Sequence, residues 1–303
     1  MNSRVKRWAE RFLLSTGVAG AAQRRLPRSA VLVLAYHDVV TEGQDAVGDS
    51  SLHLSRRRFA EQLELLGDTF DIVSLADAMN STTTPGRPRV AITFDDAYDG
   101  TLGAALEELA KRDLPGTIFV APALLGNTAW WDELANPAGG GVPVVARDHA
   151  LWMLGGRNKQ VMAWARDELA NRGPRHTPRI GSVDQLDRAA SMPRITLAAH
   201  TWSHVNLCAI PPAERALELS RPLSWLAERY EHTLPMMSYP YGLYSQAVAG
   251  AVRDAGYERA FRVDGGWVRD PANVDPHAIP RYNVPAGLSL DGFRLRLAGI
   301  GAS

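Results

Sequence analysis

Two adjacent carboxylates, Asp95 and Asp96, follow the apolar run Val90–Phe94. Strand-favouring residues that end at acidic groups predict a buried strand delivering both carboxylates to the edge of a sheet, because charges are not left unpaired in a core. Two like charges side by side need a cation. We therefore expect a cation to bind at the end of this strand.

Two histidines, His200 and His204, follow a second short apolar run, Ile195–Ala199. Histidines four residues apart share one face of a helical turn, so both rings can reach one metal ion. One carboxylate and two imidazoles make a three-ligand site with open positions for water and substrate. Such a site predicts hydrolysis, because the metal acidifies a water and polarises the scissile carbonyl while a nearby group acts as base.

The general base must lie outside the histidine pair. In the H-E-x-x-H pattern the base directly follows the first histidine, but here that position is Thr201. The spare carboxylate of the Asp95–Asp96 pair is the natural source. Each motif also has an ordinary interpretation: the acids as a strand end before a helix cap, and the histidines as common surface or core residues. The two motifs together, in this order, favour the metal site.

Strand and helix patterns alternate along the chain and predict a parallel α/β sheet. The runs that mark its β/α units are Val31–Asp38, Val90–Asp96, Thr117–Ala121, Ile195–Ala199, Met236–Gly242, Arg259–Val263 and Ala278–Tyr282. Helical spacing follows at Ser55–Leu66, Leu102–Leu109, Pro212–Tyr230 and Gln246–Ala255. About seven units predict a deformed (β/α)7-type barrel. The groups named above fall at strand ends, where such barrels carry catalytic residues, and so do His37 and Tyr241.

The alternation breaks at residues 127–192, which we interpret as a largely helical insertion within a barrel spanning residues 31–285. Trp130 and Trp131 lie in this insertion; they could stack on sugar rings, but anchoring the insertion by hydrophobic contact is favoured. Residues 1–30 form a lead-in segment, and residues 286–303 are expected to be a C-terminal tail.

Composition excludes several kinds of function. The 303-residue chain has no net charge, and no block of like charge predicts a nucleic-acid surface. The single cysteine, Cys208, excludes an internal disulfide and a cysteine-based zinc site. The N-terminus is a poor signal peptide, so we favour an amphipathic helix that packs on the barrel or touches a membrane surface. A cytoplasmic or membrane-peripheral location is expected rather than export.

Three motifs together resemble the polysaccharide deacetylase (NodB-homology, family-four carbohydrate esterase) proteins: Thr93-Phe94-Asp95-Asp96, His200-Thr201-x-x-His204 and Tyr239-Pro240-Tyr241-Gly242. The resemblance implies that Asp95 is the base and that Asp96, His200 and His204 bind a divalent metal, with Zn²⁺ the expected ion. It further implies that the backbone N–H of Tyr241 helps hold the oxyanion, and that the reaction removes an N-acetyl group from an amino sugar.

The chain departs from the family pattern at two positions. The third motif usually begins with an arginine that orients the base, but Ser238 stands there. Arg281 is the predicted substitute, with a surface arginine as the alternative. The usual C-terminal acid histidine has no clear counterpart, whereas Tyr36-His37-Asp38 resembles a branch that takes its acid from the N-terminal strand. His37 is therefore either the general acid or a hydrogen-bonded histidine at a strand end.

The leading hypothesis is metal-dependent deacetylation of a glycan or glycolipid intermediate. A second hypothesis keeps the metal site but changes the substrate to a small cyclic or linear amide. A third is a non-catalytic glycan-binding protein, against which the intact Asp95 argues, since binding needs no base.

Overall fold

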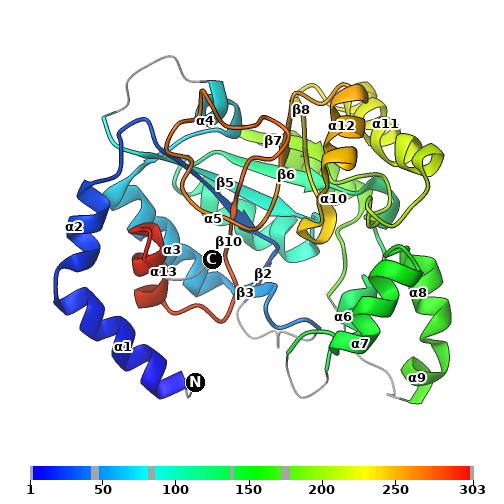
Figure 1. The fold of residues 1–303 in the computed structure, drawn as a ribbon, viewed down its shortest axis with the longest axis horizontal. Coiled ribbons are helices and arrows are strands. Elements are labelled where there is room, and N and C mark those ends of the chain that lie inside the picture. The colour runs from blue at the N-terminus through cyan, green and yellow to red at the C-terminus, as the bar shows by residue number, and fades with distance from the viewer. Residues whose placement is uncertain (1–2, 42–47, 81–85, 137–139, 172–177, 301–303) are drawn as a thin grey trace.

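The computed structural model describes residues 3–41, 48–80, 86–136, 140–171 and 178–300. A curled parallel sheet forms its centre (Figure 1), with seven strands paired in the order β10-β1-β5-β6-β7-β8-β9. Their bounds are β1 (Val31–Tyr36), β5 (Arg89–Asp95), β6 (Gly116–Val120), β7 (Ile195–Ala199), β8 (Thr233–Ser238), β9 (Arg259–Phe261) and β10 (Tyr282–Asn283). A short strand, β4 (Asp71–Ile72), also pairs with β5.

The sheet closes on itself. β10 pairs with β1 at one end of the strand order, and a parallel bridge joins Phe261 at the end of β9 to Ile279, just before β10. The predicted deformed (β/α)7-type barrel is therefore confirmed. Its parallel strands place all their carboxyl ends at one edge, where the candidate groups meet.

Alternation of side chains along each strand gives the barrel two apolar layers. On β1, Val31 and Val33 face a cluster that includes Ala91 and Phe119 from neighbouring strands, while Leu32 and Leu34 face the helices outside. Because both faces are covered, the strands are continuous apolar runs, as parallel strands usually are. This burial is what makes the strand ends rigid platforms for polar groups.

Helices cover the outside of the sheet. They are α3 (Arg56–Thr69), α4 (Leu75–Asn80), α5 (Leu106–Ala110), α10 (Val183–Ala190), α11 (Pro212–Arg229) and α12 (Gln246–Asp254). Ser55 caps α3, since its side chain accepts a hydrogen bond from the Arg58 N–H. The helix expected from Leu102 begins as a π-helical turn, η1 (Thr101–Ala105), before it continues as α5.

The region 127–192 contains mainly helices, and those before α10 lie at the lower right of Figure 1. They are α6 (Trp130–Leu134), α7 (Val144–Asp148), the π-helical turn η3 (His149–Met153), α8 (Asn158–Trp164) and α9 (Arg166–Asn171), followed by α10. Trp130, Trp131 and Leu151 share an apolar core of their own with Tyr98 from the barrel. Both tryptophans are buried, in keeping with an anchoring role. Two short 3₁₀ turns, η2 (Pro122–Leu124) and η4 (Pro240–Gly242), follow strands β6 and β8.

Both ends of the chain form helices outside the barrel. The lead-in segment contains α1 (Ser3–Ser15) and α2 (Val18–Arg24). The expected C-terminal tail is instead partly helical, because α13 (Leu290–Leu297) is capped by Ser289 and buries Phe293, Leu295 and Leu297. Gly292 and the two arginines between these apolar residues hide the helical pattern. Among the described residues, no helix combines the length and apolar character that crossing a bilayer requires.

Candidate active site

Three buried side chains converge at the carboxyl edge of the sheet. The Nε2 atoms of His200 and His204 lie 3.1 Å apart, and Asp96 Oδ1 lies 3.5 Å from the first and 3.1 Å from the second. One ligand atom from each residue falls within 4.8 Å of the others. The carboxylate and the two imidazoles that the sequence groups together are therefore in position to share one ion.

The histidines meet through a turn rather than a helix. Thr201 and His204 both have left-handed backbone conformations, with φ of 60° and 57°, and the Thr201 hydroxyl accepts a hydrogen bond from the His204 N–H. The predicted helical turn at residues 200–204 is thus wrong. A tight turn closed by the threonine brings the two rings together instead.

The backbone also bends between the two aspartates. Strand β5 ends at Asp95, and Asp96 has a φ of 70°. Successive side chains on a straight strand point to opposite faces, so this bend allows both carboxylates to line the same cavity. A left-handed aspartate is uncommon, and such strain clusters at functional sites.

Burial shifts the pKa of all three side chains, and a hydrogen bond fixes the tautomer of His200. The Nδ1–H of His200 donates to the Ser238 carbonyl oxygen over 2.8 Å, which leaves its Nε2 as a bare lone pair. Burial lowers the pKa of His200 to about 4 and of His204 to about 3, so both rings are neutral at pH 7. Burial raises the pKa of Asp96 to about 6.

Asp95 is paired with a different cation. Arg281 donates from Nη1 to Asp95 Oδ1 over 2.8 Å and from Nη2 to Oδ2 over 2.7 Å, and both side chains are buried. Ser238 links the pair, because its hydroxyl accepts from Arg281 and donates to Asp95. Burial opposes ionisation of Asp95, but the Arg281 guanidinium and His200 hold the pKa of this carboxyl well below its usual range.

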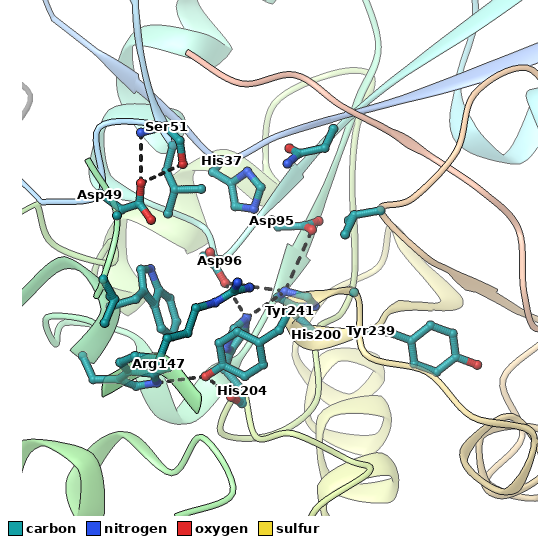
Figure 2. A pocket seen from close by; sticks show the side chains of 18 residues that line it. His37, Asp49, Ser51, Asp95, Asp96, Arg147, His200, His204, Tyr239 and Tyr241 are labelled. Atoms are coloured by element: carbon teal, nitrogen blue, oxygen red, sulfur yellow. Dashed lines mark hydrogen bonds and ion pairs between the residues drawn. The ribbon is translucent and has the colours of Figure 1, made fainter. Parts of the chain in front are cut away.

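These groups open into one cavity of about 300 Å³ (Figure 2). Asp95, Asp96, His200 and His204 line it together with His37. His37 follows β1 and is partly exposed, so solvent or substrate can reach its ring.

Tyr241 closes another side of the cavity. It has a left-handed backbone with a φ of 59°, and its hydroxyl donates to the His204 carbonyl oxygen over 3.0 Å. Outside the helices and strands of the described part of the chain, no backbone acceptor is found for its N–H.

A comparison with known protein families identifies the family to which a chain with this site belongs. The family model described as polysaccharide deacetylase matches residues 82–260, which is more than half of the chain. The chain belongs to the polysaccharide deacetylase family. The matched region contains Asp95, Asp96 and both histidines, whereas His37 and Arg281 lie outside it.

Individual similar proteins support the assignment to this family. The polysaccharide deacetylase YxkH of Bacillus subtilis is 20% identical over 265 residues, covering 86% of this chain and 74% of its own. Among solved structures, the Streptococcus pyogenes deacetylase PplD in complex with acetate has a TM-score of 0.60 at 15% identity, covering 88% of this chain and 98% of its own. IcaB from Ammonifex degensii has a TM-score of 0.60 at 19% identity, covering 89% and 96%. These structures share the fold of this deacetylase.

The site fits the divalent metal on which this family generally depends. Asp96 Oδ1 is buried, yet it accepts no hydrogen bond from any described residue, although two imidazole nitrogens lie within 3.5 Å. A cation bound between Asp96 Oδ1 and the Nε2 atoms of the two histidines would satisfy this buried oxygen. Oxygen and nitrogen donors of this kind suit a divalent ion such as Zn²⁺.

Sequence reasoning missed Arg147 of the deacetylase. It comes from α7 in the insertion and lines the cavity (Figure 2). Nothing in the local sequence marks it, because an arginine in a short helix is usually a solvated surface residue.

A second missed feature is a buried polar network centred on His53. Its Nδ1 lies 2.9 Å from Asp38 Oδ2 and its Nε2 lies 2.9 Å from Asp132 Oδ1. With a carboxylate at each nitrogen, the ring must donate twice and carries a positive charge. Burial opposes this charge, but the hydrogen bonds to Asp132 and Asp38 raise the pKa of His53 to about 9.

This network reaches the candidate metal site through the insertion. Tyr98 donates to Asp132 Oδ2 over 2.6 Å and accepts a hydrogen bond from Trp131 Nε1 over 2.7 Å. The Trp131 ring lies against His204, with centroids 4.5 Å apart. The His53 network therefore helps fix the wall of the cavity beside one candidate ligand.

Proposed function

We propose that this deacetylase hydrolyses the N-acetyl group of an amino sugar in a glycan or glycolipid, using a divalent metal held by Asp96, His200 and His204. The proposal rests on one observation: the two adjacent aspartates have different partners. Asp95 is paired with Arg281, while the Oδ1 atom of Asp96 lies near two neutral histidines and accepts no hydrogen bond from the described residues. This difference supports separate roles for the two aspartates, Asp95 as the base and Asp96 as the metal ligand.

The residues of the chain can account for the proton transfers. Asp95 takes a proton from the attacking water as its oxygen adds to the amide carbonyl. The Tyr241 N–H donates to the oxygen that becomes negative. When the C–N bond breaks, His37 gives its proton to the departing nitrogen, which leaves as a free amine with acetate as the second product. A proton then passes back to His37 and Asp95 loses its own to solvent.

The low pKa of Asp95 makes it a weak base. A metal that acidifies the attacking water would compensate for this weakness. The bidentate contact with Arg281 keeps the carboxylate ionised and oriented at the cost of basicity. A divalent ion bound here would supply Lewis acidity to the acyl carbonyl and lower the pKa of the attacking water.

An assay of acetate release tests the proposal. Oligomers of N-acetylglucosamine are incubated with the wild-type protein, with and without a chelator, and after addition of Zn²⁺, Co²⁺ or Mn²⁺. We expect metal-dependent release of acetate and of free amines. Asp95→Asn should remove activity while the bound metal remains, whereas Asp96→Ala and His204→Ala should lose the metal, as measured by elemental analysis.

The rival functions give different results. Hydrolysis of small amides without release of acetate from the oligomers would favour the small-amide hydrolase. Binding of oligomers without any hydrolysis in the metal-loaded protein would favour the glycan-binding protein. Undiminished metal content in both ligand variants would refute the assigned site.

A further inference from the structure

An apolar stripe on α1 is exposed to solvent. Val5, Trp8 and Phe12 recur at the spacing of one helix face and are 52%, 69% and 56% exposed. Trp8 and Phe12 stack with their ring centroids 5.7 Å apart and an angle of 11° between planes. Aromatic side chains are seldom left in water in this way, so the stripe needs a partner.

The opposite face of α1 is fixed to the body of the protein. Glu10 is buried and accepts a hydrogen bond from the Ser289 hydroxyl at the start of α13. Leu14 packs on an apolar cluster that includes Ala19 and Leu295. Because Glu10 and Leu14 hold this face inward, the helix presents Val5, Trp8 and Phe12 outward.

Exposed large apolar residues are concentrated in two segments. Of the eleven found in the described part of the chain, five lie at the N-terminus (Val5, Trp8, Phe12, Leu13 and Val18), five in the insertion (Val144, Val145, Trp152, Met153 and Trp164), and one elsewhere, Leu217. Figure 1 places α1 and the insertion helix α9 along the same lower edge of the molecule, at opposite corners. Leu217 belongs to α11 at the upper right.

The N-terminal segment is also strongly basic. Its first 30 residues contain seven arginine and lysine residues but one acidic residue, Glu10, although the whole chain is neutral. An apolar stripe with aromatic residues among basic ones is typical of helices that lie in the interface of an anionic membrane. A symmetric dimer through this stripe would instead bring two basic segments together.

We propose that α1 is an interfacial helix that binds the deacetylase to a bilayer containing anionic lipid. Val5, Trp8 and Phe12 enter the boundary between headgroups and acyl chains, and the positive charge of the N-terminal segment attracts the anionic headgroups. The contacts of Glu10 and Leu14 with the body then set the orientation of the protein on the surface.

Vesicle co-sedimentation tests this proposal. The full chain is mixed with vesicles of phosphatidylcholine containing about one third phosphatidylglycerol, or of phosphatidylcholine alone, at low and high salt. We expect binding to the anionic vesicles that weakens with salt. Trp8→Gln combined with Phe12→Gln should weaken this binding at least tenfold, because glutamine keeps the helix and removes the apolar surface. Leu217→Gln, a matched exposed apolar residue on α11, should bind like the wild type.

Three outcomes would overturn the proposal: no binding to anionic vesicles at low salt, equal binding by the double variant, or conversion of a dimer to a monomer by the double variant without any effect on vesicles. Circular dichroism of each variant establishes that its helices are intact. The residues changed lie outside the cavity, so hydrolysis of soluble oligomers should be unaffected by either substitution.

Discussion

At the scale of single residues, the contact between Arg281 and Asp95 carries the most chemical information. Arg281 satisfies both oxygens of one carboxylate and also donates to Thr93 and to the Arg262 carbonyl oxygen. A planar guanidinium can serve all of these acceptors at once, whereas an ammonium acts as a single point. The orientation of Asp95 therefore depends on the shape of its partner as well as on its charge.

Replacement of Arg281 tests this dependence. We expect Arg281→Met to reduce kcat by about a hundredfold or more, and Arg281→Lys to restore little of the loss, while metal content stays near that of the wild type. Losing the partner of a buried carboxylate should also cost about 3–5 kcal/mol of stability, so activity is measured on folded protein at low temperature. Arg259→Met is the control, because the acceptors of Arg259 among the described residues are neutral, the Met79 carbonyl oxygen and the Asn80 side chain. Full activity in Arg281→Lys would contradict the argument.

A second substitution tests the general acid. We expect His37→Ala to retain the metal and to lose activity by about 10²–10⁴-fold, since that is the usual contribution of a positioned proton donor. Amides whose amine leaves easily need less protonation, so the loss should be smaller for an activated anilide substrate. Equal losses on both substrates would assign the acid to another residue.

The sequence was most informative for residues at the ends of apolar runs. Asp95, Asp96 and His200 could be placed because each lies at the carboxyl end of a strand, and parallel strands bring these ends together. Arg281 was placed at the end of the apolar run Ala278–Pro280, although strand β10 begins only after it, at Tyr282. Arg147 could not be placed in this way. Its position depends on how α7 packs over the cavity, which side-chain spacing within the insertion does not specify.

At the scale of elements, two departures from expectation have local causes. Residues 200–204 have the spacing of a helical turn, but the left-handed conformations of Thr201 and His204 produce a tighter turn. Helix α13 was missed because its apolar residues alternate with polar ones, and only packing against α1 and α3 makes the helix favourable. In both cases, tertiary contacts outweighed the local pattern.

The His53 network joins the two-stranded sheet β2 (Asp38–Val40) and β3 (His53–Ser55) to α6 of the insertion. Because the pKa of His53 rises from 6.5 to about 9 on folding, the charged ring stabilises the folded state fully below pH 6.5, and this stabilisation is lost as pH rises through 9.

We therefore expect His53→Gln to be less stable than the wild type at pH 6, by an amount on the order of 3 kcal/mol. The difference between the two proteins should shrink towards pH 9.5. Urea unfolding at a series of pH values measures it. His232→Gln, which changes an exposed histidine outside this network, is the control. A constant gap across the range would mean that His53 is neutral in the folded protein.

At the scale of the whole molecule, the proposed metal ligands come from two distant segments, Asp96 after β5 and the histidines after β7. A metal bound to this cluster binds the folded state in preference to the unfolded chain, and so raises the unfolding temperature.

We expect a chelator to lower the Tm of the metal-loaded protein by several degrees, and an excess of Zn²⁺ to restore it. Asp96→Ala should have a Tm that neither treatment changes. A scanning calorimeter records both effects, and an equal response of wild type and variant would show that the metal acts elsewhere on the chain.

The pairing of Arg281 with Asp95 also constrains how the protein can be made. The two residues are separated by 186 positions in the sequence. At about 5–20 residues per second, a ribosome needs on the order of 10–40 s to travel between them. Throughout that interval the nascent chain contains the carboxylate without its counter-ion, and a carboxylate in that state resists burial. The barrel must therefore remain open at this edge until the last strand has been synthesised, and its closure becomes one of the final events after translation.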